Sequence, residues 1–173
     1  MIDERALIGG RERREIVIVA YDSEWPARFE RERARISAAL GPRAQAIEHV
    51  GSTAVPGLAA KSIVDVLVTV SDVENESLMR PLAQAGYELR VREPGHRMFR
   101  TPARDVHVHI WAAADPEVER MLRFRDRLRS SHEDRAAYER LKRELAGLDW
   151  EDMNAYADAK GPLIEKILSR AGR

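Results

Sequence analysis

The sequence contains no cysteine, which excludes disulfide bonds and metal sites built on thiolates. It also lacks an excess of either charge, since Lys and Arg together number 29 and Asp and Glu together number 29. A net charge of zero gives no general electrostatic attraction to nucleic acid or to an anionic membrane. The composition therefore predicts that neither nucleic acid nor a membrane is the partner of this protein.

Long hydrophobic runs are missing as well. No apolar stretch approaches the length that spans a bilayer, and the charged stretch from Asp3 to Arg14 has no apolar core of the secretory type. With the absence of cysteine, which is typical of a reducing compartment, this predicts a cytoplasmic protein. The polar residues 1–14 predict a mobile N-terminal segment, and the length predicts a single domain over residues 15–173.

The chain is organised around residues 44–70, which predict a strand, a glycine-rich loop and a second strand. Residues 44–50 form the first strand, and the loop begins at Gly51-Ser52. Residues 63–70 are nearly all apolar and rich in β-branched side chains, which is typical of a strand buried on both faces. Asp65 lies inside this run. Because burying a charge is costly unless it is paired or bound to a metal, Asp65 is the first candidate for function.

This arrangement resembles the core motif of the DNA-polymerase-β-like nucleotidyltransferases, in which a Gly-Ser turn precedes a strand carrying Asp-x-Asp or Asp-x-Glu. The stretch from Glu48 to Lys61 is similar, more specifically, to the GrpB family, a poorly characterised family of that fold. Further segments that resemble this family are Tyr21–Pro26, Leu82–Tyr87, His107–His109, Phe124–Arg129, Tyr138–Lys142 and Tyr156–Lys160. The resemblance implies an α+β fold with a nucleotidyltransferase-like mixed sheet packed by helices.

The periodicity along the chain predicts about five strands followed by a helical C-terminal third. Predicted strands cover residues 16–19, 44–50, 63–70, 87–91, 97–101 and 106–111, of which 87–91 and 97–101 form a hairpin. Predicted helices run from Trp25 to a stop at Gly41-Pro42, and from Ser71 to about Ala85 with an interruption at Pro81. Later helices start at the caps Asp115 and Ser131, and a last pair breaks near Gly161.

Asp65 and two histidines are the predicted metal ligands. Leu67 shares a strand face with Asp65 and stands where the superfamily has its second metal-binding acid, so the two-metal site is incomplete. His107 and His109 share a face of another strand and can supply imidazole ligands instead. The ion would be Mg²⁺, Mn²⁺ or Zn²⁺, and imidazole favours the last two. In the alternative interpretation, Asp65 is a structural carboxylate that bonds loop amides or a histidine.

Substrate contacts are predicted from the loop and from nearby charges. Gly51, Ser52 and Thr53 can present backbone amides and hydroxyls to a phosphate. Other candidates are Glu48, His49, Lys61, Arg125 and Lys160. Only one of Glu48 and His49 can face the site, because adjacent strand residues point to opposite faces. For Arg125 the alternative is a solvated helix surface.

These features predict a nucleotidyltransferase-like protein that binds a nucleotide or another phosphorylated small molecule. If it is an enzyme, Asp65 is the catalytic residue of a metal-dependent nucleotidyl transfer. The alternative is a non-catalytic ligand-binding or interaction module of the same fold, and the fusion of GrpB-like segments to dephospho-CoA kinases implies a role accessory to coenzyme A synthesis. A third class, nucleic-acid binding through residues 120–129, is disfavoured by the zero net charge. The oligomeric state does not follow from the sequence.

Overall fold

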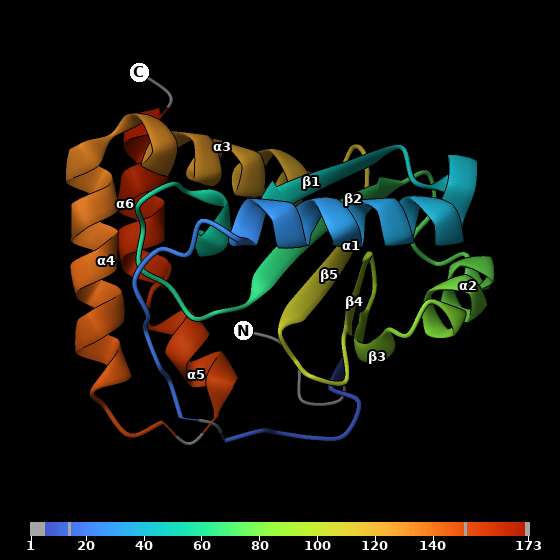
Figure 1. Ribbon diagram of the computed structural model, residues 1–173, viewed down its shortest axis with the longest axis horizontal. Coiled ribbons are helices and arrows are strands. Elements are labelled where there is room, and N and C mark those ends of the chain that lie inside the picture. The colour runs from blue at the N-terminus through green and yellow to red at the C-terminus, as the bar shows by residue number, and fades with distance from the viewer. Residues whose placement is uncertain (1–5, 14, 151, 172–173) are drawn as a thin grey trace.

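A computed structural model describes residues 6–13, 15–150 and 152–171 of the chain. In this part, five strands form one mixed sheet in the order β1-β2-β5-β4-β3 (Figure 1). The strands are β1 (Ala46–Val50), β2 (Val64–Val70), β3 (Glu88–Glu93), β4 (His96–Arg100) and β5 (Val106–Ala112). β5 lies between β2 and β4, parallel to the former and antiparallel to the latter. The last strand in the sequence is therefore the central strand of the sheet, which confirms the predicted α+β architecture.

Helices α1 (Trp25–Leu40) and α2 (Met79–Gln84) cover one face of the sheet. α1 begins and ends where the sequence predicts, and it buries the predicted apolar side chains Trp25, Phe29, Ile36 and Leu40. These pack against the alternate side chains of the two central strands, Val64, Val66, Val68, Val106, Val108 and Ile110. The opposite face of β2 and β5 is therefore left for Asp65 and the histidines.

Four helices form the C-terminal part beside the sheet, at the left and along the top of Figure 1. They are α3 (Pro116–Ser130), α4 (His132–Ala146), α5 (Met153–Asp158) and α6 (Gly161–Ala171). The predicted caps are present, since the Asp115 side chain accepts from the Glu117 N–H and the Ser131 side chain from the Asp134 N–H. The loop after β1 inserts between these helices and the sheet, with Val55 fully buried. The glycine-rich loop is thus held by the C-terminal helices.

One predicted element is wrong, and another begins later than predicted. Residues 16–19 do not form a strand; only Val19 pairs, with Ala60, through backbone hydrogen bonds of 2.9 and 3.0 Å. The loop that contains Ala60 pairs with this β-branched run at Val19 alone, so the run does not extend into a strand. The helix predicted from Ser71 begins later, with a turn at Glu76–Leu78 before α2. Pro81 lies in the first turn of α2, where its missing N–H has no partner to lose.

The N-terminal segment contacts the sheet over its described part. Leu7 forms a bridge with Val91, and the Arg90 guanidinium donates hydrogen bonds to the carbonyls of Ile8 and Gly10. Glu12 forms an ion pair with Arg100. Residues 1–5 and 14 lie outside the described residues, and the mobility of residues 1–14 stays a prediction. Residues 6–13, however, have defined contacts with the domain.

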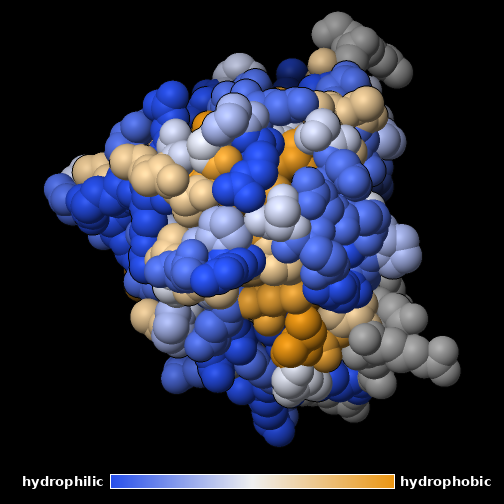
Figure 2. All heavy atoms as spheres, turned by 90° about the vertical axis from the view of Figure 1, so that its right-hand side faces the viewer, coloured by the Kyte–Doolittle hydropathy of each residue, from blue (hydrophilic) through white to orange (hydrophobic). Residues whose placement is uncertain are grey.

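The molecular surface is mostly polar on the side where α2 lies. Figure 2 shows this side as largely hydrophilic, with a hydrophobic patch below its centre and smaller hydrophobic spots near its top. Within the described ranges, no helix combines the length and the apolar character that crossing a membrane requires. The large apolar side chains are instead gathered in two cores, one under α1 and α2 and one among the loop after β1, α3, α4 and α6.

Candidate functional site

Asp65, His107 and His109 meet on the face of the sheet opposite α1. In the parallel pair β2–β5, Asp65 lies beside His107 and Leu67 beside His109. The Asp65 Oδ1 atom is 3.4 Å from Nδ1 of His107 and 3.6 Å from Nε2 of His109. One ligand atom from each residue lies within 4.8 Å of the others. His109 lies beside Leu67, which stands in place of the second acid, and its imidazole can serve as a metal ligand there instead.

Asp65 is held in its ionised form. Burial alone would raise the pKa of this carboxyl, but hydrogen bonds and favourable charge interactions with His107 and His109 outweigh it and hold the pKa well below its usual range. Gly51 packs directly on this carboxylate, with a φ of 71°. A Cβ atom at Gly51 would lie 3.1 Å from Cβ and Cγ of Asp65, and closer still to Oδ2. The turn that opens the loop therefore needs glycine.

A second line of polar contacts extends from His109 away from Asp65. Its Nδ1 atom is 3.5 Å from Nε2 of His96, and Nδ1 of His96 is 3.1 Å from the Glu93 carboxylate. The two imidazole planes differ by only 4°, as an in-plane contact between ring nitrogens requires. His96 stacks on Trp111, with ring centroids 4.1 Å apart. Glu93, His96 and His109 thus form a chain that fixes the orientation of the His109 ring.

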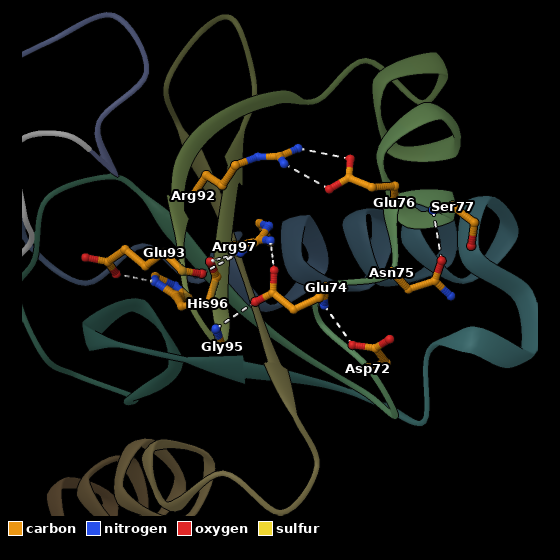
Figure 3. A network of polar contacts seen from close by, with 10 residues as sticks. All are labelled: Asp72, Glu74, Asn75, Glu76, Ser77, Arg92, Glu93, Gly95, His96 and Arg97. Atoms are coloured by element: carbon orange, nitrogen blue, oxygen red, sulfur yellow. Dashed lines mark hydrogen bonds and ion pairs between the residues drawn. The ribbon is translucent and has the colours of Figure 1, made fainter.

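The tip of the β3–β4 hairpin, which carries Glu93 and His96, is clamped to the preceding loop (Figure 3). The Glu74 carboxylate accepts from the Gly95 N–H at 2.9 Å and pairs with Arg97. Arg92 forms a bidentate pair with Glu76, at 2.9 and 3.0 Å. These contacts keep Glu93 close to His96. Burial, together with the neighbouring His109, lowers the pKa of His96, which favours the neutral ring that such a chain needs.

A cavity of about 640 Å³ opens beside Asp65, lined by the loop, the sheet and the C-terminal helices. Three lysines line it: Lys61 before β2, Lys142 in α4 and Lys160 after α5. The Lys61 and Lys160 Nζ atoms lie 5.0 and 4.5 Å from the centroid of the Tyr156 ring. Burial, helped by the charge of Lys160, lowers the pKa of Lys142 to about 7. Burial, helped by the charge of Lys61, lowers the pKa of Lys160 to about 8.

The chain is similar in sequence and in structure to proteins of one family. The family model for the GrpB protein matches residues 15–170. The chain belongs to the GrpB family. The UPF0157 protein SCO7215 of Streptomyces coelicolor is 52% identical over 167 residues, which cover 96% of this chain and 89% of that protein. A crystal structure of the conserved protein GrpB from Enterococcus faecalis has a TM-score of 0.80 at 34% identity, covering 90% of this chain and 96% of that chain.

The fold is also similar to that of more distant proteins outside the GrpB family. A structure of a cytoplasmic RNA terminal U-transferase has a TM-score of 0.50 at 16% identity and covers 73% of this chain and 38% of that chain, a likeness of fold alone. The predicted nucleotidyltransferase-like fold is thereby confirmed. The dephospho-CoA kinase of Mycolicibacterium paratuberculosis is 31% identical over 184 residues, and the match covers 89% of this chain but only 45% of that protein.

Four of the predicted substrate contacts line the cavity of this GrpB-family chain, namely Gly51, Ser52, Lys61 and Lys160. The other four do not. His49 points to the opposite face of the sheet, stacks on Phe29 at 4.7 Å and contacts the Thr53 hydroxyl at 3.0 Å. Burial lowers the pKa of His49 to about 4, so this ring is neutral. Glu48 pairs with Arg125 at 2.9 Å. The structure therefore assigns structural contacts to these four residues.

The arginine-rich helix α3 is likewise engaged within the GrpB fold. Arg127 pairs with the buried Asp134 at 2.7 Å, and Arg129 donates to the Ala54 carbonyl at 2.9 Å. Arg120 and Arg123 pair with glutamates. These arginines of the run 120–129 therefore have carboxylate or carbonyl partners within the fold.

Three further residues line the cavity that were not among the predicted site residues: Tyr138, Lys142 and Tyr156. The signal was present, because Tyr138–Lys142 and Tyr156–Lys160 repeat the same spacing of four residues. That spacing places both side chains on one face of a helix, and the Lys142 and Lys160 Nζ atoms do lie over the rings of their tyrosines, at 5.1 and 4.5 Å. Nothing in the spacing shows, however, that this face is turned toward Asp65.

Proposed function

We propose that this GrpB-family protein binds a nucleotide or another phosphorylated small molecule against one divalent ion. The observation that carries the proposal is the convergence of Asp65, His107 and His109 at the wall of a cavity that three lysines also line. Two imidazoles and one carboxylate suit Zn²⁺ or Mn²⁺ better than Mg²⁺, which prefers oxygen ligands. When bound, the ion would neutralise and orient phosphate oxygens.

The chain itself supplies the remaining contacts for a phosphorylated ligand. Lys61, Lys142 and Lys160 come from three separate parts of the chain and bring positive charge to one cavity. Tyr156 lines the same cavity, and its hydroxyl is buried without a hydrogen-bond partner among the described residues. A buried hydroxyl of this kind favours a ligand that completes its hydrogen bonding. Lys61 and the C-terminal part of the chain therefore contribute the phosphate-binding wall, and the sheet contributes the metal ligands.

If the protein is an enzyme, the proposed reaction is nucleotidyl transfer. The second candidate function is a binding module without catalytic activity. The second is favoured by one observation, because Leu67 is fully buried where the superfamily has an acid. A single ion cannot clamp both the attacking and the leaving oxygen as two ions do. In that case the domain would present a phosphorylated ligand to a partner. The likeness to part of a dephospho-CoA kinase suggests a coenzyme A precursor.

A ligand screen tests the function. Zn²⁺ and Mn²⁺ are first titrated calorimetrically into the purified protein, and the melting temperature is then measured with nucleotides and coenzyme A precursors, with and without each ion. A ligand that binds only the folded protein raises the melting temperature. A metal-dependent rise with one ligand class supports the proposal, and turnover of that ligand separates the enzyme from the module. Absence of both metal and ligand binding would overturn it.

The lysine cluster predicts a pH dependence for anion binding without metal. Lys142 and Lys160, with pKa values lowered to about 7 and about 8, lose their protons as the pH rises through these values. Sulfate keeps its charge over this range. Its affinity is therefore expected to fall about five- to tenfold between about pH 7 and about pH 9, measured by calorimetry. The Lys160→Gln variant should show a smaller fall. An affinity that stays constant in the unchanged protein contradicts this role of the lysines.

The chain from Glu93 through His96 predicts a positioning effect on His109. Glu93→Gln removes the charge that holds His96, so Zn²⁺ affinity is expected to fall about tenfold, in the range typical of residues behind a ligand. The control is Glu76→Gln, which removes a hairpin ion pair without touching His96. Competition with a chromophoric chelator measures both affinities. Equal Zn²⁺ affinity in the two variants would show that the Glu93–His96 contact is only structural.

A further inference from the structure

A second cluster of positive charge lines the cavity, apart from the lysines. It consists of Arg90 from β3, Arg100 from β4 and Arg104 from the turn before β5. Arg100 is the register neighbour of His107 across the β4–β5 pair, on the same face of the sheet. The arginine cluster therefore begins next to one of the proposed metal ligands.

The anion that now occupies this cluster is the chain's own Glu12. Its two carboxylate oxygens accept from both Nη atoms of Arg100, at 2.8 and 2.9 Å, and Nη1 of Arg104 lies 3.5 Å from Oε2. This parallel, two-bond geometry is the one by which guanidinium groups hold carboxylates and phosphates alike. Glu12 lies before residues 15–170, which the family model matches, whereas all three arginines lie within that range.

One carboxylate does not balance the cluster. The Arg90 guanidinium donates hydrogen bonds to the neutral carbonyls of Ile8 and Gly10, not to a carboxylate. The buried Nε of Arg100 has no hydrogen-bond partner in the described part of the chain. Arg104 is held at a φ of 59°, the left-handed region that costs a non-glycine residue energy and recurs at functional sites. Arg100 and Arg104 pair with Glu12, and Arg90 lies near enough to act on it through its charge. The three guanidinium groups thus carry more positive charge than this carboxylate neutralises, which suits a dianion better than a single negative charge.

We propose that Arg90, Arg100 and Arg104 form a second phosphate-binding subsite of the cavity, which Glu12 blocks until a phosphate group displaces it. This inference rests on the proposed function, since both subsites would serve one ligand. It narrows the ligand class to small molecules that carry two separate phosphorylated or anionic groups, one for the lysines and one for the arginines. Glu12 then acts as a tethered competitor for the second group.

The test is the Glu12→Gln variant, titrated with inorganic phosphate in metal-free buffer by calorimetry. Removing the competitor should raise phosphate affinity about tenfold, as expected if about one tenth of the molecules are open before the substitution. The gain should disappear in the double variant Glu12→Gln/Arg104→Gln. Glu15→Gln is the control, because it removes one negative charge from the same segment at another position that lines the cavity, and it should not tighten binding.

Either of two results overturns the proposal: phosphate affinity that is equal in Glu12→Gln and the unchanged protein, or a gain that persists in the double variant. Should Glu12→Gln fold poorly by circular dichroism, Arg104→Gln in the unchanged background serves instead. It should weaken phosphate binding several-fold, and unchanged binding would overturn the subsite. Zn²⁺ titration of the same proteins separates this test from the proposed function, because the arginine subsite needs no metal.

Discussion

Replacing Asp65 with asparagine is expected to abolish binding of Zn²⁺ and Mn²⁺ while leaving a folded protein. Asparagine keeps the size of the side chain but removes the negative charge that both histidines face. The loss should exceed about 100-fold, because even residues behind a metal ligand typically contribute 10–100-fold. Calorimetric titration of each ion measures this loss. Metal-dependent stabilisation by nucleotides should disappear in the same variant.

The matched control is Asp105→Asn, at the residue before the strand that carries both histidines. Its carboxylate pairs with Arg28 at 2.7 Å and accepts from the Thr101 hydroxyl at 2.6 Å, outside the metal cluster. This variant should bind both ions with unchanged affinity. If Asp65→Asn also binds Zn²⁺ normally, the carboxylate is a structural partner of the two histidines. The protein would then be a ligand-binding module without the proposed ion.

The second large effect is expected from Gly51→Ala. The added Cβ collides with the Asp65 carboxylate, so either the loop or the carboxylate must move. With a φ of 71° and a ψ of −170°, this position lies in a region that is essentially restricted to glycine, so a side chain adds a strain of about 1–3 kcal/mol. The melting temperature should therefore fall by several degrees. Metal affinity should fall at least about tenfold in the protein that remains folded, since Asp65 no longer faces His107 and His109 as before.

The Gly57→Ala variant is the control that distinguishes backbone strain from the collision with Asp65. Gly57 also has a positive φ, 77°, but a Cβ placed there meets no atom within 4 Å. This control should lose stability from strain alone and should keep its metal affinity. Urea denaturation and metal titration of the two variants provide the comparison. Equal metal affinity in both would mean that the contact between Gly51 and Asp65 does not organise the site.

Much of the fold could be predicted because apolar spacing reports burial directly. The α1 stripe from Trp25 to Leu40 and the alternation of Val106, Val108 and Ile110 match the buried side chains of the structure. The strand predicted at residues 16–19 is absent, because strand formation also needs a partner that local spacing does not report. A run of β-branched residues becomes a strand only when a neighbouring strand is available, and that depends on the rest of the chain.

The three candidate metal ligands could be predicted from the sequence, whereas most residues that line the cavity beside them could not. Asp65, His107 and His109 were expected to approach each other, and the parallel register brings them together. The turn of His49 toward Phe29 and the approach of Lys142 depend on how a helix docks against the sheet, which spacing along one element does not report. Arg100 was not predicted, because its place beside His107 follows from the pairing of two strands.

The position of β5 has a consequence for how the protein folds as it is synthesised. Until this strand is made, the sheet can exist only as two separate antiparallel pairs, β1–β2 and β3–β4, with the edges of β2 and β4 unpaired. Docking of β5 closes both edges and brings His107 beside Asp65 in the same event. Because pairing between distant segments is slow, the ligand site would form late and abruptly. Variants that delay this docking would expose two strand edges to aggregation without touching the native structure.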